Sequence, residues 1–167
     1  MKKMQMIKNI YLNNDQETRE IGFKLGKLLK PGSIVCLIGD LGAGKTTMTQ
    51  SLAEALEVDD YITSPTFTIV NQYEGKMPLY HFDVYRIGCS EEMYDIGFEE
   101  YINGDGVCII EWANIIEDIL PDEYLKIEFV DLNYYIQKIQ DKLYTRDYYT
   151  NTTYFRLFIP ELYPEYD

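Results

Sequence analysis

The segment from Gly39 to Thr46 constrains the fold of this chain more than any other part of the sequence. It reads Gly-Asp-Leu-Gly-Ala-Gly-Lys-Thr and matches the G-x-x-x-x-G-K-S/T pattern of a phosphate-binding loop. The apolar run 33–38 before it predicts a buried strand, and apolar residues at helical spacing predict a helix over 45–56. Strand, glycine loop and helix form the context that the motif requires. We therefore predict an α/β protein with the P-loop NTPase fold, in a single domain over residues 1–167.

The chemistry of this loop points to a bound nucleotide. Its glycines let backbone N–H groups turn inward around a phosphate, and the following helix adds unpaired N–H groups and the positive end of its dipole. We predict that Lys45 carries a mobile charge to the β- and γ-phosphates and that the Thr46 hydroxyl binds Mg²⁺. The loop residues predicted to contact the nucleotide are Asp40, Leu41, Gly42, Ala43, Gly44, Lys45, Thr46 and Thr47.

The remaining elements follow from hydrophobic periodicity and from turn residues, and they predict a mixed sheet. A helix is expected to begin at the cap Asn13-Asn14-Asp15 and to end before Pro31. Strands 67–73 and 79–86 flank a short turn with Gly75, which predicts an antiparallel hairpin. The other strands are expected over 4–12, 107–111, 124–130 and 154–159, and the other helices over 90–102, 113–120 and 132–143.

The charge of the chain limits its direct partners. The formal net charge is −13, and the only arginines are Arg19, Arg86, Arg146 and Arg156. A protein that grips a nucleic-acid backbone needs a basic surface, so tight direct binding of RNA or DNA is not expected. An acidic protein can still serve a nucleic-acid pathway when a partner supplies the positive surface.

The sequence predicts a cytoplasmic protein without membrane association. No apolar run approaches the ~18 residues of a membrane span. The first residues, Met1 to Met4, lack the apolar core of a secretion signal. Cys36 and Cys108 fall in predicted core strands and Cys89 in a loop, without the spacing of metal ligands, so reduced thiols are expected.

Later acids and a hydroxyl are candidates for the second half of a nucleotide site. Glu111 ends a predicted buried strand, where it could hold Mg²⁺ through water or orient the attacking water; the alternative is a solvated acid. Asp83 is either a second functional acid or an exposed residue between Phe82 and Val84 in the core. Thr66 either senses the γ-phosphate or begins a strand.

Two further residues have competing interpretations. His81 is the only histidine, and we interpret it as a hydrogen-bonded structural residue. Trp112 could cover the nucleotide or a partner surface, or it could pack in the core.

Four blocks together resemble one family. Residues 39–47, 64–68 (Ser-Pro-Thr-Phe-Thr), 81–86 (His-Phe-Asp-Val-Tyr-Arg) and 110–112 (Ile-Glu-Trp) occur in the order typical of the TsaE family, also called YjeE. The resemblance covers about residues 6–130. It implies a P-loop α/β domain whose parallel central sheet carries antiparallel strands at its edges and is flanked by helices.

This resemblance also implies an activity. TsaE proteins bind ATP and Mg²⁺, hydrolyse ATP weakly alone and act with the TsaB–TsaD pair. That pair transfers a threonylcarbamoyl group to adenosine 37 of tRNAs that read codons starting with A. The chain is therefore expected to be a partner-activated ATPase that meets tRNA only through the complex.

Roles for single residues come from the same resemblance. By the resemblance, Lys45 and Thr46 are phosphate and Mg²⁺ ligands, and Ser64-Pro65-Thr66 form a switch-like loop. Asp83 and Glu111 are the functional acids, and Trp112 is the neighbouring functional aromatic residue. Residues 131–153 depart from the family pattern, and we interpret them as an insertion before a last strand.

Other classes of P-loop protein fit the sequence less well. A small-molecule kinase usually clamps phosphates and acidic substrates with several arginines, and the four arginines of this chain are scattered along the sequence. A GTPase would need an Asn-Lys-x-Asp segment, and none is present. A non-hydrolysing interaction module, in which the nucleotide only orders the fold, is the third alternative.

Overall fold

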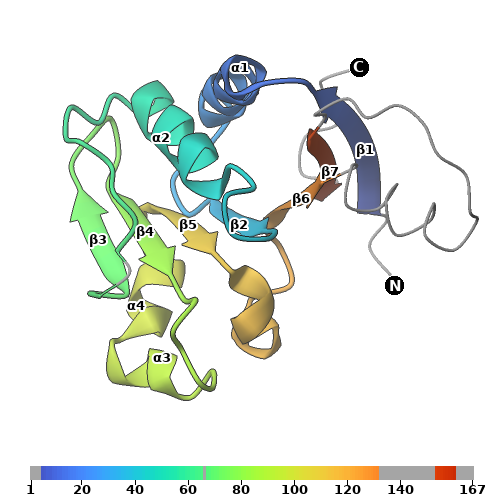
Figure 1. Ribbon diagram of the computed structural model, residues 1–167. Coiled ribbons are helices and arrows are strands. Elements are labelled where there is room, and N and C mark those ends of the chain that lie inside the picture. The colour runs from blue at the N-terminus through green and yellow to red at the C-terminus, as the bar shows by residue number, and fades with distance from the viewer. Residues whose placement is uncertain (1–4, 66, 132–152, 161–167) are drawn as a thin grey trace, which may run out of the picture.

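The computed structural model describes residues 5–65, 67–131 and 153–160. A seven-stranded sheet runs through it in the order β1-β7-β6-β2-β5-β4-β3 (Figure 1). The strands are β1 (Gln5–Leu12), β2 (Ile34–Ile38), β3 (Val70–Tyr73), β4 (Leu79–Asp83), β5 (Val107–Glu111), β6 (Leu125–Asp131) and β7 (Thr153–Pro160). The helices are α1 (Asp15–Gly26), α2 (Lys45–Ala55), α3 (Glu92–Asp95), α4 (Phe98–Ile102) and the 3₁₀ helix η1 (Ala113–Ile119).

Side chains of the central strand β2 alternate between two hydrophobic clusters, one on each face of the sheet. Val35 and Leu37 belong to the cluster under α1 and α2. Ile34 and Cys36 belong to the cluster that packs against α3, α4 and η1. Figure 1 shows the two helical layers on opposite faces of the sheet. Burial on both faces explains why β2 reads as an unbroken apolar run.

The sheet has a parallel centre and antiparallel edges. Strands β6, β2, β5 and β4 lie parallel to one another. Strand β3 pairs antiparallel with β4, and β7 pairs antiparallel with β6 and β1. The predicted mixed sheet and the predicted hairpin of β3 and β4 are therefore confirmed.

The register of the parallel strands determines where the acids lie. Glu111 at the end of β5 is paired with Leu37 of β2 on one side and with Asp83 of β4 on the other. Parallel strands end at the same edge of a sheet, so both acids lie beside the loop that follows β2.

No helix in the three described ranges is long and apolar enough to cross a membrane.

Strand β4 ends three residues earlier than predicted, at Asp83 instead of Arg86. The Asp83 side chain accepts a hydrogen bond from the N–H of Tyr85 at 3.1 Å, which replaces a ladder bond with a local turn. The chain therefore leaves the sheet where its acid is.

Strand β3 begins later than predicted, at Val70 instead of Phe67. The N–H groups of Thr68 and Ile69 both donate to the carbonyl of Pro65, at 3.2 and 2.8 Å. This turn, with Ile69 at a φ of 65°, is incompatible with extended pairing.

The helical predictions were correct in position but too regular. The helix predicted over 90–102 is divided into α3 and α4 by Gly97, which has a φ of 72°. The helix predicted over 113–120 is the 3₁₀ helix η1, and α1 ends at Gly26 instead of just before Pro31. The helix predicted over 132–143 lies outside the described residues.

Helices α1 and α2 approach each other closely at two glycines of α1. A Cβ on Gly22 would lie 2.7 Å from the Cβ of Ser51, and one on Gly26 would lie 2.5 Å from the Cβ of Ala55. A Cβ on Gly26 would also lie 2.9 Å from the carbonyl oxygen of Leu52, which belongs to the α2 backbone. The glycines therefore allow α1 to cover the helix that follows the phosphate-binding loop.

Gly26→Ala is expected to destabilise the fold by about 1–3 kcal/mol, because overpacking at the helix contact outweighs the better helix propensity of alanine. Urea unfolding followed by circular dichroism measures the loss. Lys24→Ala, on the exposed side of the same helix, is the matched control and should change stability by less than about 0.5 kcal/mol. Equal stabilities of the two variants would contradict the packing argument.

Candidate active site

The loop between β2 and α2 has a backbone shaped for an anion. Gly42 and Gly44 have φ values of 78° and 104°, in the region that favours glycine. A Cβ on Gly42 would meet no heavy atom within 4 Å, so its conformation and not crowding requires glycine there. The first N–H groups of α2, which begins at Lys45, have no intrahelical acceptor.

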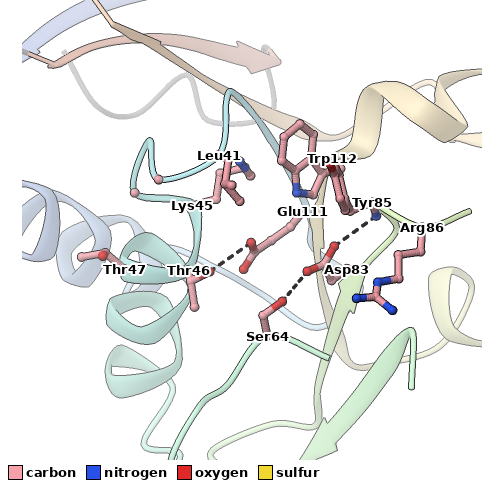
Figure 2. A pocket seen from close by; sticks show the side chains of 12 residues that line it. Leu41, Lys45, Thr46, Thr47, Ser64, Asp83, Tyr85, Arg86, Glu111 and Trp112 are labelled. Atoms are coloured by element: carbon pink, nitrogen blue, oxygen red, sulfur yellow. Dashed lines mark hydrogen bonds between the residues drawn. The ribbon is translucent and has the colours of Figure 1, made fainter. Parts of the chain in front are cut away.

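A cavity of about 390 Å³ opens beside this loop. Figure 2 shows side chains from the loop, α2, β4 and β5 converging on it. Its lining consists of Leu41, Gly42, Gly44, Lys45, Thr46, Thr47, Ser64, Asp83, Tyr85, Arg86, Glu111 and Trp112.

Glu111 is almost fully buried, with 2% of its surface exposed. Its Oε2 accepts a hydrogen bond from the Thr46 hydroxyl at 3.2 Å (Figure 2). Its Oε1 accepts from the Thr49 hydroxyl at 3.1 Å and lies 2.9 Å from Nε2 of His81. The interpretation of Glu111 as a solvated acid is therefore wrong. A buried carboxylate with this many donors is a group held in place.

Asp83 is also buried, with 8% of its surface exposed, and so are its neighbours Phe82 and Val84. The alternative of an exposed residue between two core residues is therefore wrong. Its Oδ2 accepts a hydrogen bond from the Ser64 hydroxyl, and its Oδ1 accepts the N–H of Tyr85 (Figure 2). Asp83 thus connects the segment after α2 to the end of β4.

The ammonium group of Lys45 lies inside the loop. Its Nζ donates to the carbonyl oxygens of Gly39 and Asp40 at 2.7 and 2.8 Å. Burial lowers the pKa of this ammonium group, and the nearby carboxylates of Glu111 and Asp83 oppose the shift. The cation therefore remains close to both acids without a direct ion pair to either.

The indole of Trp112 forms part of the cavity wall and packs on the core as well. Its ring centroid is 3.8 Å from Nζ of Lys45, a cation–π contact, and 4.7 Å from the ring of Tyr85. The same side chain packs against the cluster under α3 and α4, as the core interpretation predicted, and a role in covering a nucleotide or a partner surface stays a prediction. The guanidinium of Arg86 stacks 4.6 Å from the ring of Phe67, which is 87% exposed.

The structure brings most of the predicted site residues together. Those that line the cavity are Leu41, Gly42, Gly44, Lys45, Thr46, Thr47, Ser64, Asp83, Glu111 and Trp112. Asp40 and Ala43 belong to the loop but not to the lining, and Asp40 contributes its carbonyl oxygen to Lys45. Thr66 lies outside the described residues.

Sequence reasoning did not assign site roles to Thr49, His81, Tyr85 or Arg86. Thr49 could have been found, because it follows Thr46 by three positions and such residues share one side of a helix. His81 and Asp83 are two positions apart on β4, so they lie on the same side of the strand. For Tyr85 and Arg86 the signal was their place in the block 81–86 of the family resemblance. Periodicity gave no signal for them, because they follow the unexpected turn at the end of β4.

The fold and the loop together define a P-loop NTPase of the α/β class, with a mostly parallel sheet and the glycine loop between its first central strand and a helix. The family model described as "Threonylcarbamoyl adenosine biosynthesis protein TsaE" matches residues 12–139. This chain belongs to the TsaE family.

Similar proteins agree with this assignment. The tRNA threonylcarbamoyladenosine biosynthesis protein TsaE of Bacillus subtilis is 49% identical over 115 residues, which cover 68% of this chain and 72% of that protein. Its counterpart in Treponema pallidum is 46% identical over 107 residues, with 64% and 79% covered. The crystal structure of Bacillus YdiB superposes with a TM-score of 0.69 at 35% identity, over 94% of this chain and 88% of that one.

Thr49→Val is expected to destabilise the protein by about 1–3 kcal/mol, because it leaves a buried carboxylate with one donor fewer. Ser51→Ala is the matched control: both hydroxyls bond to a carbonyl one turn back in α2, but of these two only Thr49 also reaches Glu111. The control should lose no more than about 1 kcal/mol in the same urea titration. Equal losses would show that the bond to Glu111 contributes nothing.

Proposed function

We propose that this chain is a Mg²⁺-dependent ATPase that works with TsaB and TsaD homologues in the synthesis of threonylcarbamoyladenosine at adenosine 37 of tRNAs reading codons that start with A. One observation carries the proposal: the Lys45 ammonium, the Thr46 hydroxyl and the Glu111 carboxylate line one cavity beside the glycine loop. The names of the relatives support the pathway, and the site supports the reaction.

The residues at this site suit a magnesium-bearing nucleotide. Mg²⁺ prefers oxygen ligands and usually retains several waters, and the hydroxyl of Thr46 and Oε2 of Glu111 are oxygens only 3.2 Å apart. When bound, Mg²⁺ would neutralise the charge on the phosphate oxygens. Thr46 and Glu111 would hold it, the latter directly or through water.

Lys45 would change acceptors when the nucleotide enters. Its Nζ is bonded to two loop carbonyls, and phosphate oxygens are stronger acceptors for an ammonium group. The N–H groups at the start of α2 would bind the same phosphates. Trp112, in contact with Lys45, would then lie next to the bound nucleotide.

Glu111 would orient the attacking water, as expected for the acid of a P-loop site. In the reaction, a bond forms between the water oxygen and the γ-phosphorus. The bond from that phosphorus to the oxygen of ADP breaks, and the proton of the water is released with the phosphate. Asp83, beside Glu111, would hold the segment of Ser64 through its hydrogen bond to the Ser64 hydroxyl. This segment precedes Thr66, the proposed sensor of the γ-phosphate.

The charge of the chain supports action through a complex. At −13 it is poorly suited to hold tRNA, so the TsaB–TsaD pair would contact the RNA. We also expect low turnover without partners, and the position of Arg86 supports this expectation. Arg86 lines the cavity, but its guanidinium is stacked on Phe67.

The charge and the absence of a membrane span among the described helices agree with the cytoplasmic location that we propose.

A small-molecule kinase is less well supported. Kinases of this class hold phosphates and acidic substrates with several arginines. Among the arginines whose side chains the structure describes, Arg19 donates to Gln50 away from the cavity, and Arg86 alone lines it.

Lys45→Ala is expected to weaken ATP binding by about 10- to 100-fold, because charge-assisted hydrogen bonds to the phosphates are lost. Isothermal titration with a non-hydrolysable ATP analogue and Mg²⁺ measures the change. Lys24→Ala removes an exposed lysine of α1 and should bind as the unchanged chain does. Unchanged affinity in Lys45→Ala would remove the basis of the proposal.

Glu111→Gln is expected to lower ATP turnover by about 100-fold or more, while ATP binding remains, because the amide cannot orient the water as the carboxylate does. Phosphate release is measured with and without the TsaB and TsaD homologues. Glu99→Gln, on the exposed surface of α4, is the control. If the wild-type chain binds ATP but shows no turnover even with its partners, the alternative of a non-hydrolysing interaction module is favoured.

A further inference from the structure

The two oxygens of the Glu111 carboxylate have different surroundings. Oε2 is bonded to the hydroxyl of Thr46, which lines the cavity. Oε1 points to the interior, where its neighbours Thr49 and His81 are both fully buried. One oxygen of the acid is therefore bonded to a residue that lines the cavity, and the other to residues of the interior.

Thr49 cannot hold Oε1 by itself. A hydroxyl group has one hydrogen, and the oxygen of Thr49 lies 3.1 Å from Oε1 of Glu111 and 3.1 Å from the carbonyl oxygen of Lys45. The hydrogen is therefore shared between two acceptors. Among the described residues, the other hydrogen-bonding neighbour of Oε1 is His81, whose Nε2 lies 2.9 Å away.

The contacts of the His81 imidazole favour one placement of its hydrogen. With the Glu111 carboxyl ionised, a hydrogen on Nε2 is the arrangement that the 2.9 Å distance favours, because a bare nitrogen there would set two lone pairs against each other. Nδ1 is buried and has no hydrogen-bond partner among the described residues. Among those residues, the bond to Glu111 is thus the contact that fixes the ring.

The position of His81 in the sheet makes this contact possible. His81 is paired with Ile109 across the parallel ladder of β4 and β5, and Glu111 is two positions further along β5. Side chains two positions apart lie on the same side of a strand, so the ring reaches Glu111 diagonally. Asp83 follows His81 by two positions and lies on the same side of β4 as the ring.

We propose that His81 is a positioning residue for the proposed ATPase reaction: its Nε2–H anchors Oε1 of Glu111, so that Oε2 stays directed into the cavity when a magnesium-bearing nucleotide draws the Thr46 hydroxyl away. This inference rests on the proposed function. In the structure, the Thr46 hydroxyl and Oε2 hold each other. Once the hydroxyl has another partner, the contacts of Oε1 are the hydrogen bonds from protein that still orient the carboxylate.

The first test exchanges the donor at position 81. His81→Leu removes the donor, and His81→Gln places an N–H group at a similar distance from the backbone. His81→Asn also carries an N–H group, but its side chain is too short to reach Oε1 of Glu111. With the TsaB and TsaD homologues present, His81→Leu and His81→Asn should lower kcat about 10- to 100-fold, with ATP affinity nearly unchanged. His81→Gln should recover most of the activity.

A second measurement does not depend on turnover. Mn²⁺ serves as a probe for Mg²⁺, and its binding is followed by water-proton relaxation in the presence of a non-hydrolysable ATP analogue. His81→Leu and His81→Asn should weaken Mn²⁺ binding by about 10-fold, and His81→Gln should not. In a Glu111→Gln background the same exchanges should have no further effect, because His81 acts through Glu111.

Ile109→Val is the matched control, because it trims the buried register partner of His81 without touching the carboxylate. It should leave kcat and Mn²⁺ binding unchanged. If His81→Leu fails to fold, the comparison of His81→Gln with His81→Asn decides the question.

The single histidine also permits a direct spectroscopic check. Long-range ¹H–¹⁵N spectra of the untagged chain need no assignment and should show the hydrogen on Nε2. A hydrogen on Nδ1 only would overturn the inference. If the wild-type chain is active, two further results would overturn the inference. One is that His81→Leu is as active as the wild type, and the other is that His81→Gln and His81→Asn lose activity equally. An unchanged chain that neither binds nor hydrolyses ATP would instead overturn the proposed function.

Discussion

The arrangement of this molecule depends on one buried charge, the carboxylate of Glu111. A carboxylate removed from water is tolerated only when donors surround it, and here the donors come from α2 and β4. The parallel register of β2, β5 and β4 is what brings those elements to the same edge of the sheet. The same contacts that compensate the buried acid therefore attach the helix after the glycine loop to the second half of the site.

A second linkage runs through Asp83. Its two oxygens bind Ser64, which follows α2, and the backbone of Tyr85, which follows β4. A displacement of the segment around Ser64 would thus shift Asp83 and the end of β4, which lie next to Glu111 and Trp112. Three of the segments that border the cavity are therefore hydrogen-bonded to a buried acid: α2, the segment of Ser64 and the end of β4.

Much of this could be predicted from the sequence, because local patterns determined it. The glycine loop, β2 and β5 with its terminal acid follow from a motif and from apolar runs, and they were found where expected. The end of β4 was missed, because a side-chain hydrogen bond decides it. The helix predicted over 90–102 was too long, because the left-handed Gly97 divides it. The contact of His81 with Glu111 joins residues 30 positions apart, and no local pattern reports such a contact.

The outer part of the sheet has a consequence for the order in which the protein can form. Strand β1 is paired with β7 along its whole length, and β7 in turn with β6. Strand β1 is translated before the other strands that the structure describes, and it cannot pair with β7 until the residues between the two strands and β7 itself have been translated. Until then its backbone remains an open edge, and chaperones or non-native strands could compete for it during synthesis.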